Sequence, residues 1–331
     1  MKKFYIFIII LFVLIFSNSI NESETKPVLM GESAEINQSD SSPSPEILYD
    51  SKDINPIKIM ALKNSIYITD NKNSFDQNEY CEVPTELAGS KILVNKDTPL
   101  EKDNMKVNLT DIDSRKVILE HPGLKLGSSA AKALYSMLAA AQRDGIKGFV
   151  LNSAYRSESS QQEIFNYNLN VFKKSCKTYS EALKKTHLLV AAPGFSEHQT
   201  GLAVDLFSVN GRHRSDFKGT KEQIWLDSNA YKYGFTLRYS SDKTEVTGAT
   251  YEPWHFRFTD IPLSTYLFSK GLCLEEFYQK IFSGQVLEGK YCLFMKVDRD
   301  QKVYFRGSKN ATIALEPVKK GVLLLTVKYK T

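Results

Sequence analysis

The chain has 331 residues, of which 42% are hydrophobic and 24% charged, and its net charge is +5. This is the composition of an ordinary globular protein, and composition alone says little more about the function. The length allows one sizeable core with accessory parts, and two domains are the prior expectation. No basic stretch interleaved with aromatic residues is present, so nothing points to a nucleic-acid partner.

The N-terminus has the pattern of a secretory signal. Lys2 and Lys3 precede an apolar run of thirteen residues, 4–16, and small residues follow at positions 17 and 19. The run is shorter than the roughly 20 residues that a membrane-spanning helix needs. We therefore expect residues 1–20 to be a signal peptide or an uncleaved signal anchor. The protein is then extracytoplasmic, either secreted or tethered to the outer face of the cell membrane.

Residues 21–90 are predicted to be a disordered linker that contains short accessory strands. The segment is rich in Ser, Asn, Glu and Pro, and residues 21–50 carry seven acids and one lysine. Short β-branched pieces within 57–68 are the candidate strands. The rest of the chain is strongly basic, which suits an anionic surface such as a cell-wall polymer. A basic surface that is simply solvated is an equally good interpretation.

The folded body is expected to begin near residue 91 and to end near 270. The clearest helix covers residues 127–145, where Ser128 or Ser129 can cap the start and Gly145 can close the end. A short buried strand follows it and leads to Arg156. Helices therefore come first and short strands follow, which favours an α+β fold with an antiparallel sheet. The other expected elements are a strand at 149–154 and helices at 158–173, 178–190 and 223–233.

Residues 271–331 differ in character and are predicted to form a helix followed by a small β module. The helix is expected at 274–282, and the module is too small to fold comfortably alone, so we expect it to dock on the body. Its four alternating segments are 293–297, 302–306, 312–315 and 322–329.

Four cysteines lie far apart, with no C-x-x-C spacing, which makes them poor zinc ligands. Export would permit disulfides, and Cys273 could pair with Cys292, although pairing cannot be deduced from sequence. The other two are Cys81 and Cys176.

The first chemical motif is PGFSEHQTGLAVDL, residues 193–206, which contains His198 and Asp205. Gly201 allows a sharp turn after His198, and the following residues alternate as a strand. On this strand Asp205 faces away from the hydrophobic core. A turn followed by a short strand can bring the two side chains onto one metal ion.

The second motif is YEPWHFRF, residues 251–258, which contains Glu252 and His255. Residues three apart point to opposite faces of a straight strand, so a bulge or turn must bring these two together, and Pro253 fits such a break. Two imidazoles and one carboxylate leave a zinc ion one position for water. A carboxylate beside such an ion, here Glu252, can accept the water's proton.

Taken together, four segments resemble the VanY-type zinc D,D-carboxypeptidases, which have the hedgehog/D-Ala-D-Ala peptidase fold. The resemblance covers about residues 91–270. The S-x-H-x6-D and E-x-x-H elements occur in the family's order and spacing, with Arg156 upstream. The segments are SAYRS (153–157), PGFSEHQTGLAVDL (193–206), YGFTLRY (233–239) and YEPWHFRF (251–258).

The resemblance implies a role for each matching residue. His198, Asp205 and His255 would hold Zn²⁺, with Glu252 as general base and then general acid. Arg156 would either hydrogen-bond the scissile carbonyl oxygen or clamp the substrate's terminal carboxylate; a surface salt bridge is its alternative. Ser196 would contact the substrate or simply hold the turn. Gln162 or its neighbour Gln161 would line the pocket, with a plain helix surface as the alternative. Tyr233, Arg238 and Tyr239 would shape the rim, and a place in the core is an equally good interpretation for Tyr233.

The implied activity is release of the terminal D-Ala from peptidoglycan stem pentapeptides. An L,D-carboxypeptidase acting on tetrapeptide stems is the first alternative, because the zinc motifs of the two activities are identical. A non-catalytic module that binds the cell wall is an alternative of another class, and the presence of Glu252 and Arg156 argues against it.

Overall fold

A computed structural model describes residues 66–69, 81–83, 89–101, 108–211, 213–305 and 311–329. All of them belong to one compact unit, Ile54–Thr331. The expected signal segment and most of the expected linker lie outside the described residues. Among the described helices, none combines the length and the hydrophobicity that crossing a membrane requires.

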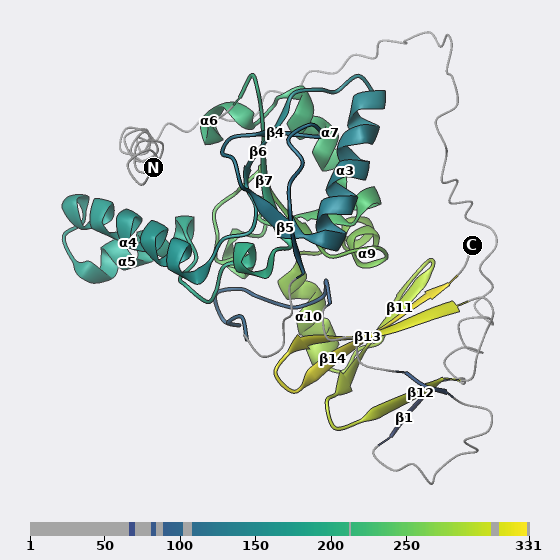
Figure 1. Cartoon of the computed structure of the whole chain (residues 1–331). Coiled ribbons are helices and arrows are strands. Elements are labelled where there is room, and N and C mark those ends of the chain that lie inside the picture. Colours follow the sequence, from purple (N-terminus) through teal and green to yellow (C-terminus); the bar gives the residue numbers. More distant parts are fainter. Residues whose placement is uncertain are drawn as a thin grey trace, which may run out of the picture. The chain divides into compact units, whose positions relative to one another are not determined.

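A five-stranded sheet of order β4-β6-β7-β9-β8 forms the centre of the fold (Figure 1). The strand β4 pairs parallel with β6, and the other neighbours pair antiparallel. The predicted α+β class is therefore confirmed, with one parallel pair at the sheet's edge. The strands are β4 (Ile118–Leu119), β6 (Phe149–Ser153), β7 (Ala203–Ser208), β8 (Phe235–Leu237) and β9 (His255–Phe258).

The register of this sheet brings two of the predicted ligands together. Asp205 of β7 lies opposite His255 of β9 and, on its other side, opposite Ser153 of β6. Directly opposed residues have Cβ atoms about 5 Å apart. Backbone pairing alone thus places Asp205 beside His255.

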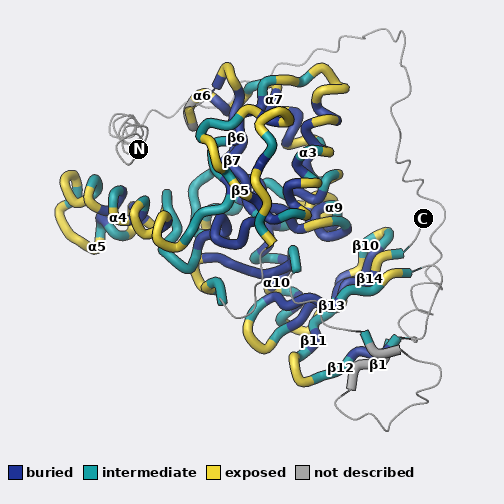
Figure 2. The backbone as a smooth tube through the Cα atoms, in the orientation of Figure 1, coloured by how far each residue is buried: buried dark blue, intermediate teal, exposed yellow. Residues whose placement is uncertain are grey.

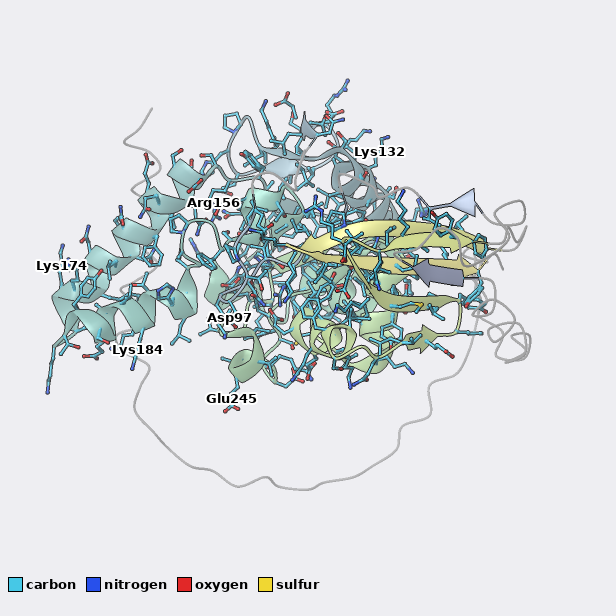
Figure 3. The ribbon with its side chains drawn as sticks, turned by 90° about the horizontal axis from the view of Figure 1, so that it is seen from below. Asp97, Lys132, Arg156, Lys174, Lys184 and Glu245 are labelled. Atoms are coloured by element: carbon cyan, nitrogen blue, oxygen red, sulfur yellow. The ribbon has the colours of Figure 1, made fainter. Side chains whose placement is uncertain are left out.

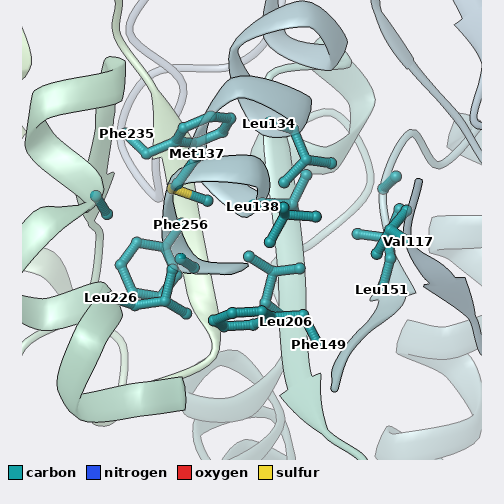
Figure 4. Close-up of a cluster of buried hydrophobic side chains, with 14 of the residues drawn as sticks. Val117, Leu134, Met137, Leu138, Phe149, Leu151, Leu206, Leu226, Phe235 and Phe256 are labelled. Atoms are coloured by element: carbon teal, nitrogen blue, oxygen red, sulfur yellow. The ribbon is translucent and has the colours of Figure 1, made fainter. Parts of the chain in front are cut away.

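Helix α3 (Ser128–Arg143) covers the sheet and builds the main core (Figure 4). Its side chains Leu134 and Met137 are fully buried. The predicted helix is confirmed but its predicted cap is not. The N-cap is Gly127, because the Ser128 hydroxyl donates to Asn108 O at 2.9 Å instead. Strand β7 is buried throughout and β6 is buried up to Leu151, as the burial colours of the tube indicate (Figure 2).

Helices α4 (Glu158–Ser175) and α5 (Tyr179–Leu189) form a hairpin with a small core of its own. The predicted cap of α5 is confirmed, since Thr178 Oγ1 accepts from Glu181 N at 3.1 Å. Lys174 marks the far end of α4 in Figure 3, and Arg156 lies near its base. The start of α4 therefore lies next to the expected site.

The segment predicted as one helix at 223–233 divides into an α-helix and a 3₁₀ turn. Thr220 caps the first, and Gly234 ends the second with a φ of 86°. The elements not yet named in this part of the chain are β3 (Leu109–Asp111), β5 (Lys125–Gly127), η3 (Glu197–Thr200), α6 (Arg214–Phe217), α7 (Lys221–Asn229), η4 (Ala230–Tyr233), α8 (Thr244–Thr247) and α9 (Leu263–Lys270).

The C-terminal part contains helix α10 (Leu274–Phe282) and two antiparallel sheets, of order β10-β11-β14-β13 and β1-β12-β2. The predicted helix and β module are confirmed. The accessory strand β1 pairs with β12, which lies near the other end of the chain. The strands are β1 (Ile66–Thr69), β2 (Cys81–Glu82), β10 (Leu287–Gly289), β11 (Cys292–Asp298), β12 (Lys302–Phe305), β13 (Ala311–Lys319) and β14 (Val322–Tyr329).

One hydrophobic cluster joins this C-terminal part to the body. It includes Leu93, Leu267 of α9, Phe277 of α10 and Phe294 of β11. Helices α9 and α10 flank the boundary predicted at residue 270, and they share this core. The expected docking of the module on the body is therefore observed.

The suggested disulfide between Cys273 and Cys292 is not formed. Both side chains are buried free thiols, and Cys176 is also free. Cys273 is the N-cap of α10. The Cys292 Sγ packs closely against Gly289, since a Cβ atom at that glycine would lie only 2.7 Å from the sulfur.

Candidate metal centre

His198 sits on the 3₁₀ turn η3, which Gly201 closes in the left-handed conformation with a φ of 66°. The Thr200 hydroxyl stabilises the turn by donating to Glu197 O and accepting from Leu202 N. Gly127 N donates to Gly201 O at 2.8 Å, and a Cβ at Gly127 would lie 2.9 Å from that oxygen. The predicted turn after His198 is thus present and held on both sides.

The ring of His198 is oriented by a backbone carbonyl. Its Nδ1 lies 2.7 Å from Ala154 O. A carbonyl oxygen only accepts, so Nδ1 carries the proton and Nε2 presents a lone pair to the site. Burial lowers the pKa of His198, which favours the neutral imidazole that a metal requires.

The ring of His255 is oriented by a carboxylate. Its Nε2 lies 3.3 Å from Glu197 Oε2. Burial raises the pKa of Glu197, but the guanidiniums of Arg238 and Arg257 outweigh it and hold that pKa well below its ordinary value. Glu197 is therefore ionised and accepts the Nε2 proton, which leaves the lone pair on Nδ1.

Asp205 stands between the two imidazoles. Its Oδ2 is 3.3 Å from His198 Nε2, and its Oδ1 is 3.1 Å from His255 Nδ1. Within the described part of the chain, the buried Oδ1 has no hydrogen-bond partner. Lone pairs on nitrogen that face carboxylate oxygens repel each other unless a proton or cation lies between them.

The three donors fit a zinc ion. One atom from each residue lies within 4.8 Å of the others, and a His₂Asp set leaves a fourth tetrahedral position for water. Burial opposes a charge on His255, yet Asp205 and Glu197 raise its pKa to about 9. A proton therefore competes with the metal for Nδ1, and metal binding releases it.

Glu252 reaches this centre through the predicted break in the strand. A turn precedes β9, in which His255 N donates to Glu252 O at 3.1 Å. The turn brings Glu252 Oε2 to 3.6 Å from His255 Nδ1, with the carboxylate side chain 10% exposed. Trp254, within the turn, stacks on Phe207 at a ring-centroid distance of 5.7 Å. A carboxylate thus lies beside the three donors.

Arg156 follows β6, and both its side chain and its backbone are held in place. Its Nη1 donates to Gln161 Oε1 at 2.7 Å, and its Nη2 donates to Ser153 Oγ at 2.9 Å. Its backbone N donates to His198 O at 3.1 Å, which ties it to the metal-site turn. Gln161 is itself fixed, because its Nε2 donates to Ala191 O at 2.6 Å. The guanidinium is therefore preorganised.

All of these groups border one pocket of about 450 Å³. Its lining combines the polar residues Arg156, Ser196 and Glu252 with residues 187–192, at the end of α5 and just after it, and residues 247–249, at the end of α8. The pocket is large enough for the end of a peptide, and it places a cation, a carboxylate and the donor set on common walls.

Three of the predicted pocket and rim residues lie elsewhere. Gln162 is exposed and pairs with Asn166 one helical turn away, while Gln161 takes the inward position. Tyr233 stacks on Trp225 at 6.3 Å and packs against the main core. α4 presents Gln161 inward, and Tyr233 belongs to the core side of η4, as its alternative interpretation had it. Arg238 is 1% exposed and pairs with Glu197 instead of shaping the rim, whereas Tyr239 does line the pocket. Ser196 does line the pocket.

Sequence analysis missed a buried ionic network behind the metal donors. Glu197, Arg238, Arg257 and Glu275 are its members. Arg257 lies two residues after His255, and strand alternation could have placed it on the same face. Glu275 lies in another part of the chain, and no motif marks it.

The chain is similar to known D-alanyl-D-alanine carboxypeptidases. The family model of the VanY D-alanyl-D-alanine carboxypeptidases matches residues 123–261. A D-alanyl-D-alanine carboxypeptidase of Enterococcus faecalis is 37% identical over 188 residues, which cover 57% of this chain and 65% of that protein. The chain therefore spans slightly less than two thirds of this relative's length.

Two solved structures are similar over nearly their whole length. VanYB in complex with D-alanine-D-alanine has 35% identity and a TM-score of 0.50, covering 57% of this chain and 97% of its own. The vancomycin resistance D,D-dipeptidase VanXYg, in complex with a D-Ala-D-Ala phosphinate analogue, has 27% identity and a TM-score of 0.60, covering 80% of this chain and 99% of its own. The chain belongs to the VanY family of D-alanyl-D-alanine carboxypeptidases.

Proposed function

We propose that this protein is a zinc-dependent D,D-carboxypeptidase that removes the terminal D-Ala of peptidoglycan stem peptides. The observation that carries the proposal is the convergence of His198, Asp205 and His255 beside Glu252, in a pocket that Arg156 also lines. When bound, Zn²⁺ lowers the pKa of water and polarises a carbonyl oxygen.

The protein's own groups supply the proton transfers. Glu252 accepts a proton from the attacking water and returns it to the leaving amine, so it acts first as base and then as acid. Its position beside the donor set, 3.6 Å from His255 Nδ1, suits this role. His198 and His255 keep their lone pairs directed inward because Ala154 O and Glu197 hold their other nitrogens.

Arg156 supplies a fixed cation for an anionic group of the substrate. An Arg at hydrogen-bond distance can stabilise the oxygen of the scissile carbonyl as it gains charge. It can equally form a bidentate pair with the C-terminal carboxylate of the peptide. Both uses require the guanidinium to be held in place, which is the task of Gln161 and Ser153.

The substrate and its location complete the proposal. The related VanYB binds D-alanine-D-alanine, which supports a D-Ala-D-Ala peptide end as the ligand of this pocket. Such stem peptides lie outside the cell membrane, which agrees with export directed by residues 1–20. The basic composition beyond the linker favours additional contact with anionic wall polymers.

A paired peptide assay with metal analysis tests the function. The purified protein should contain one zinc per chain and release D-Ala from a defined pentapeptide stem, as detected by mass spectrometry. Cleavage of the tetrapeptide stem alone would establish the L,D-carboxypeptidase instead. Binding of both stems without cleavage by the zinc-loaded protein would establish the wall-binding module.

Gln161→Ala is expected to lower kcat/KM by about 10- to 100-fold, because the Arg156 guanidinium then loses its 2.7 Å contact and its fixed position. The adjacent Gln162→Ala is the matched control, since that side chain is exposed and pairs only along its own helix. Steady-state kinetics with the pentapeptide measure both. Equal kinetics for the two variants would contradict a positioning role for Gln161.

A further inference from the structure

Behind the metal donors, the body and the C-terminal part are joined by charged side chains that are almost completely shielded from water. Arg238, which follows β8, is 1% exposed, and Glu197 is also 1% exposed. Glu275, in the first turn of α10, has a side chain that is 12% exposed. Buried charges are costly unless they are paired. Arg238 pairs with both carboxylates, and Glu197 is paired in addition with Arg257, whose Nη1 donates to Glu197 Oε1 at 2.9 Å.

The contacts form a continuous path to a predicted metal ligand. Arg238 Nη1 donates to Glu275 Oε2 at 2.8 Å, and its Nη2 donates to Oε1 of the same carboxylate. Arg238 Nε donates to Glu197 Oε1 at 2.8 Å. The other oxygen of Glu197 accepts from His255 Nε2. Each side chain in the path is thus held by the next.

The contacts around Arg238 restrain both its main chain and its guanidinium. Its backbone N donates to His255 O at 3.1 Å, which fixes its main chain beside the ligand. Its guanidinium lies 4.8 Å from the Tyr239 ring centroid, and that ring lies 5.0 Å from the His255 ring. Glu275 closes the far end of the guanidinium, and it also accepts from Asn95 Nδ2 at 3.0 Å.

We propose that Glu275 is a positioning residue of the metal site, acting through Arg238 and Glu197 on His255. Helix α10 then belongs to the metal centre, although it lies beyond the segment that carries the ligand motifs. The proposal rests on the zinc site of the proposed function. It assigns to α10 the task of keeping Glu197 Oε2 aimed at Nε2, so that Nδ1 stays available for the metal.

The test compares two neighbouring glutamates of α10. Glu275→Gln removes the charge that pairs with Arg238, and zinc affinity is expected to fall about 10-fold, as for other partners that orient ligands. Glu276→Gln is the matched control. Glu276 pairs with Lys243 at 2.9 Å, and a Gln at this position keeps an oxygen for the cap at Cys273 N. Its zinc affinity is expected to stay within 2-fold of wild type.

Competition with a chromophoric zinc chelator measures the dissociation constant without any peptide. A purely structural role for Glu275 would lower the melting temperatures of the apo and zinc forms equally and leave the zinc affinity unchanged, and that result overturns the proposal. If Glu275→Gln does not fold, Glu275→Asp keeps the charge on a shorter side chain, and wild-type zinc affinity in that variant also overturns it.

The zinc affinities test the role of Glu275 independently of the carboxypeptidase activity. A wild-type protein that binds zinc but cleaves no stem peptide would refute the carboxypeptidase activity, whereas the affinities of the two glutamine variants would still decide the role of Glu275.

Discussion

Glu252→Gln is expected to lower kcat for the pentapeptide stem by about 10³-fold while one zinc per chain remains bound. The amide has nearly the shape of the carboxylate, so the turn before β9 and the 3.1 Å bond from His255 N to the Glu252 carbonyl are kept. It cannot accept a proton from water, and the base step is lost. Kinetics and metal analysis on the same preparation measure the two effects.

The control for this variant is Glu245→Gln, which removes a carboxylate from the exposed surface of α8, outside the pocket. Its kinetics should match those of the wild type. If Glu252→Gln kept more than about a tenth of wild-type kcat with zinc bound, another group would have to be the base. Loss of zinc together with activity would instead make Glu252 a ligand.

The sequence motifs were sufficient to predict the donor set and the fold class. His198 and Asp205 are separated by a turn and a strand start, and the strand period determines which face Asp205 occupies. The break between Glu252 and His255 follows from the same period, because a straight strand could not bring them together. Within each motif local rules were enough, because these relations span only a few residues. That the two motifs meet at one site was expected from the chemistry of the combined set and from the family resemblance, and the pairing of β7 with β9 brings it about.

Contacts between distant segments could not be predicted in this way. Gln161 and Gln162 are adjacent on α4, and only the packing of that helix decides which one meets Arg156. Tyr233 ends a 3₁₀ turn whose orientation depends on Trp225. Glu275 is 37 residues from Arg238, and no periodicity relates a helix start to a strand end across that distance.

Two kinds of contact therefore position the metal donors. Backbone pairing places Asp205 beside His255, and this needs no side chain outside the sheet. The tautomers of the two imidazoles depend instead on Ala154 O and on the Glu197 carboxylate. A variant can thus keep the fold and lose the direction of the lone pairs, which is why metal affinity and stability must be measured separately.

Asp205→Ala is expected to remove the zinc-induced stabilisation of the protein. A ligand at 1,000 times its dissociation constant stabilises the folded state by about 4 kcal/mol. For a domain of this size that corresponds to a rise in melting temperature of roughly 10 °C. Asp205 contributes the anionic donor between the two imidazoles, and without it two neutral nitrogens remain. Differential scanning calorimetry with zinc and with a chelator measures the shift.

The variant's own stability does not enter this comparison, because each protein is measured against its chelated form. Asp242→Ala is the control, since that carboxylate is 72% exposed and its removal should leave the zinc-induced shift intact. A shift of wild-type size in Asp205→Ala would mean that zinc binds elsewhere on the chain. The buried Oδ1 of Asp205 in the wild type would then need a cation other than this zinc ion beside it, and the proposed mechanism would lose its anionic zinc ligand.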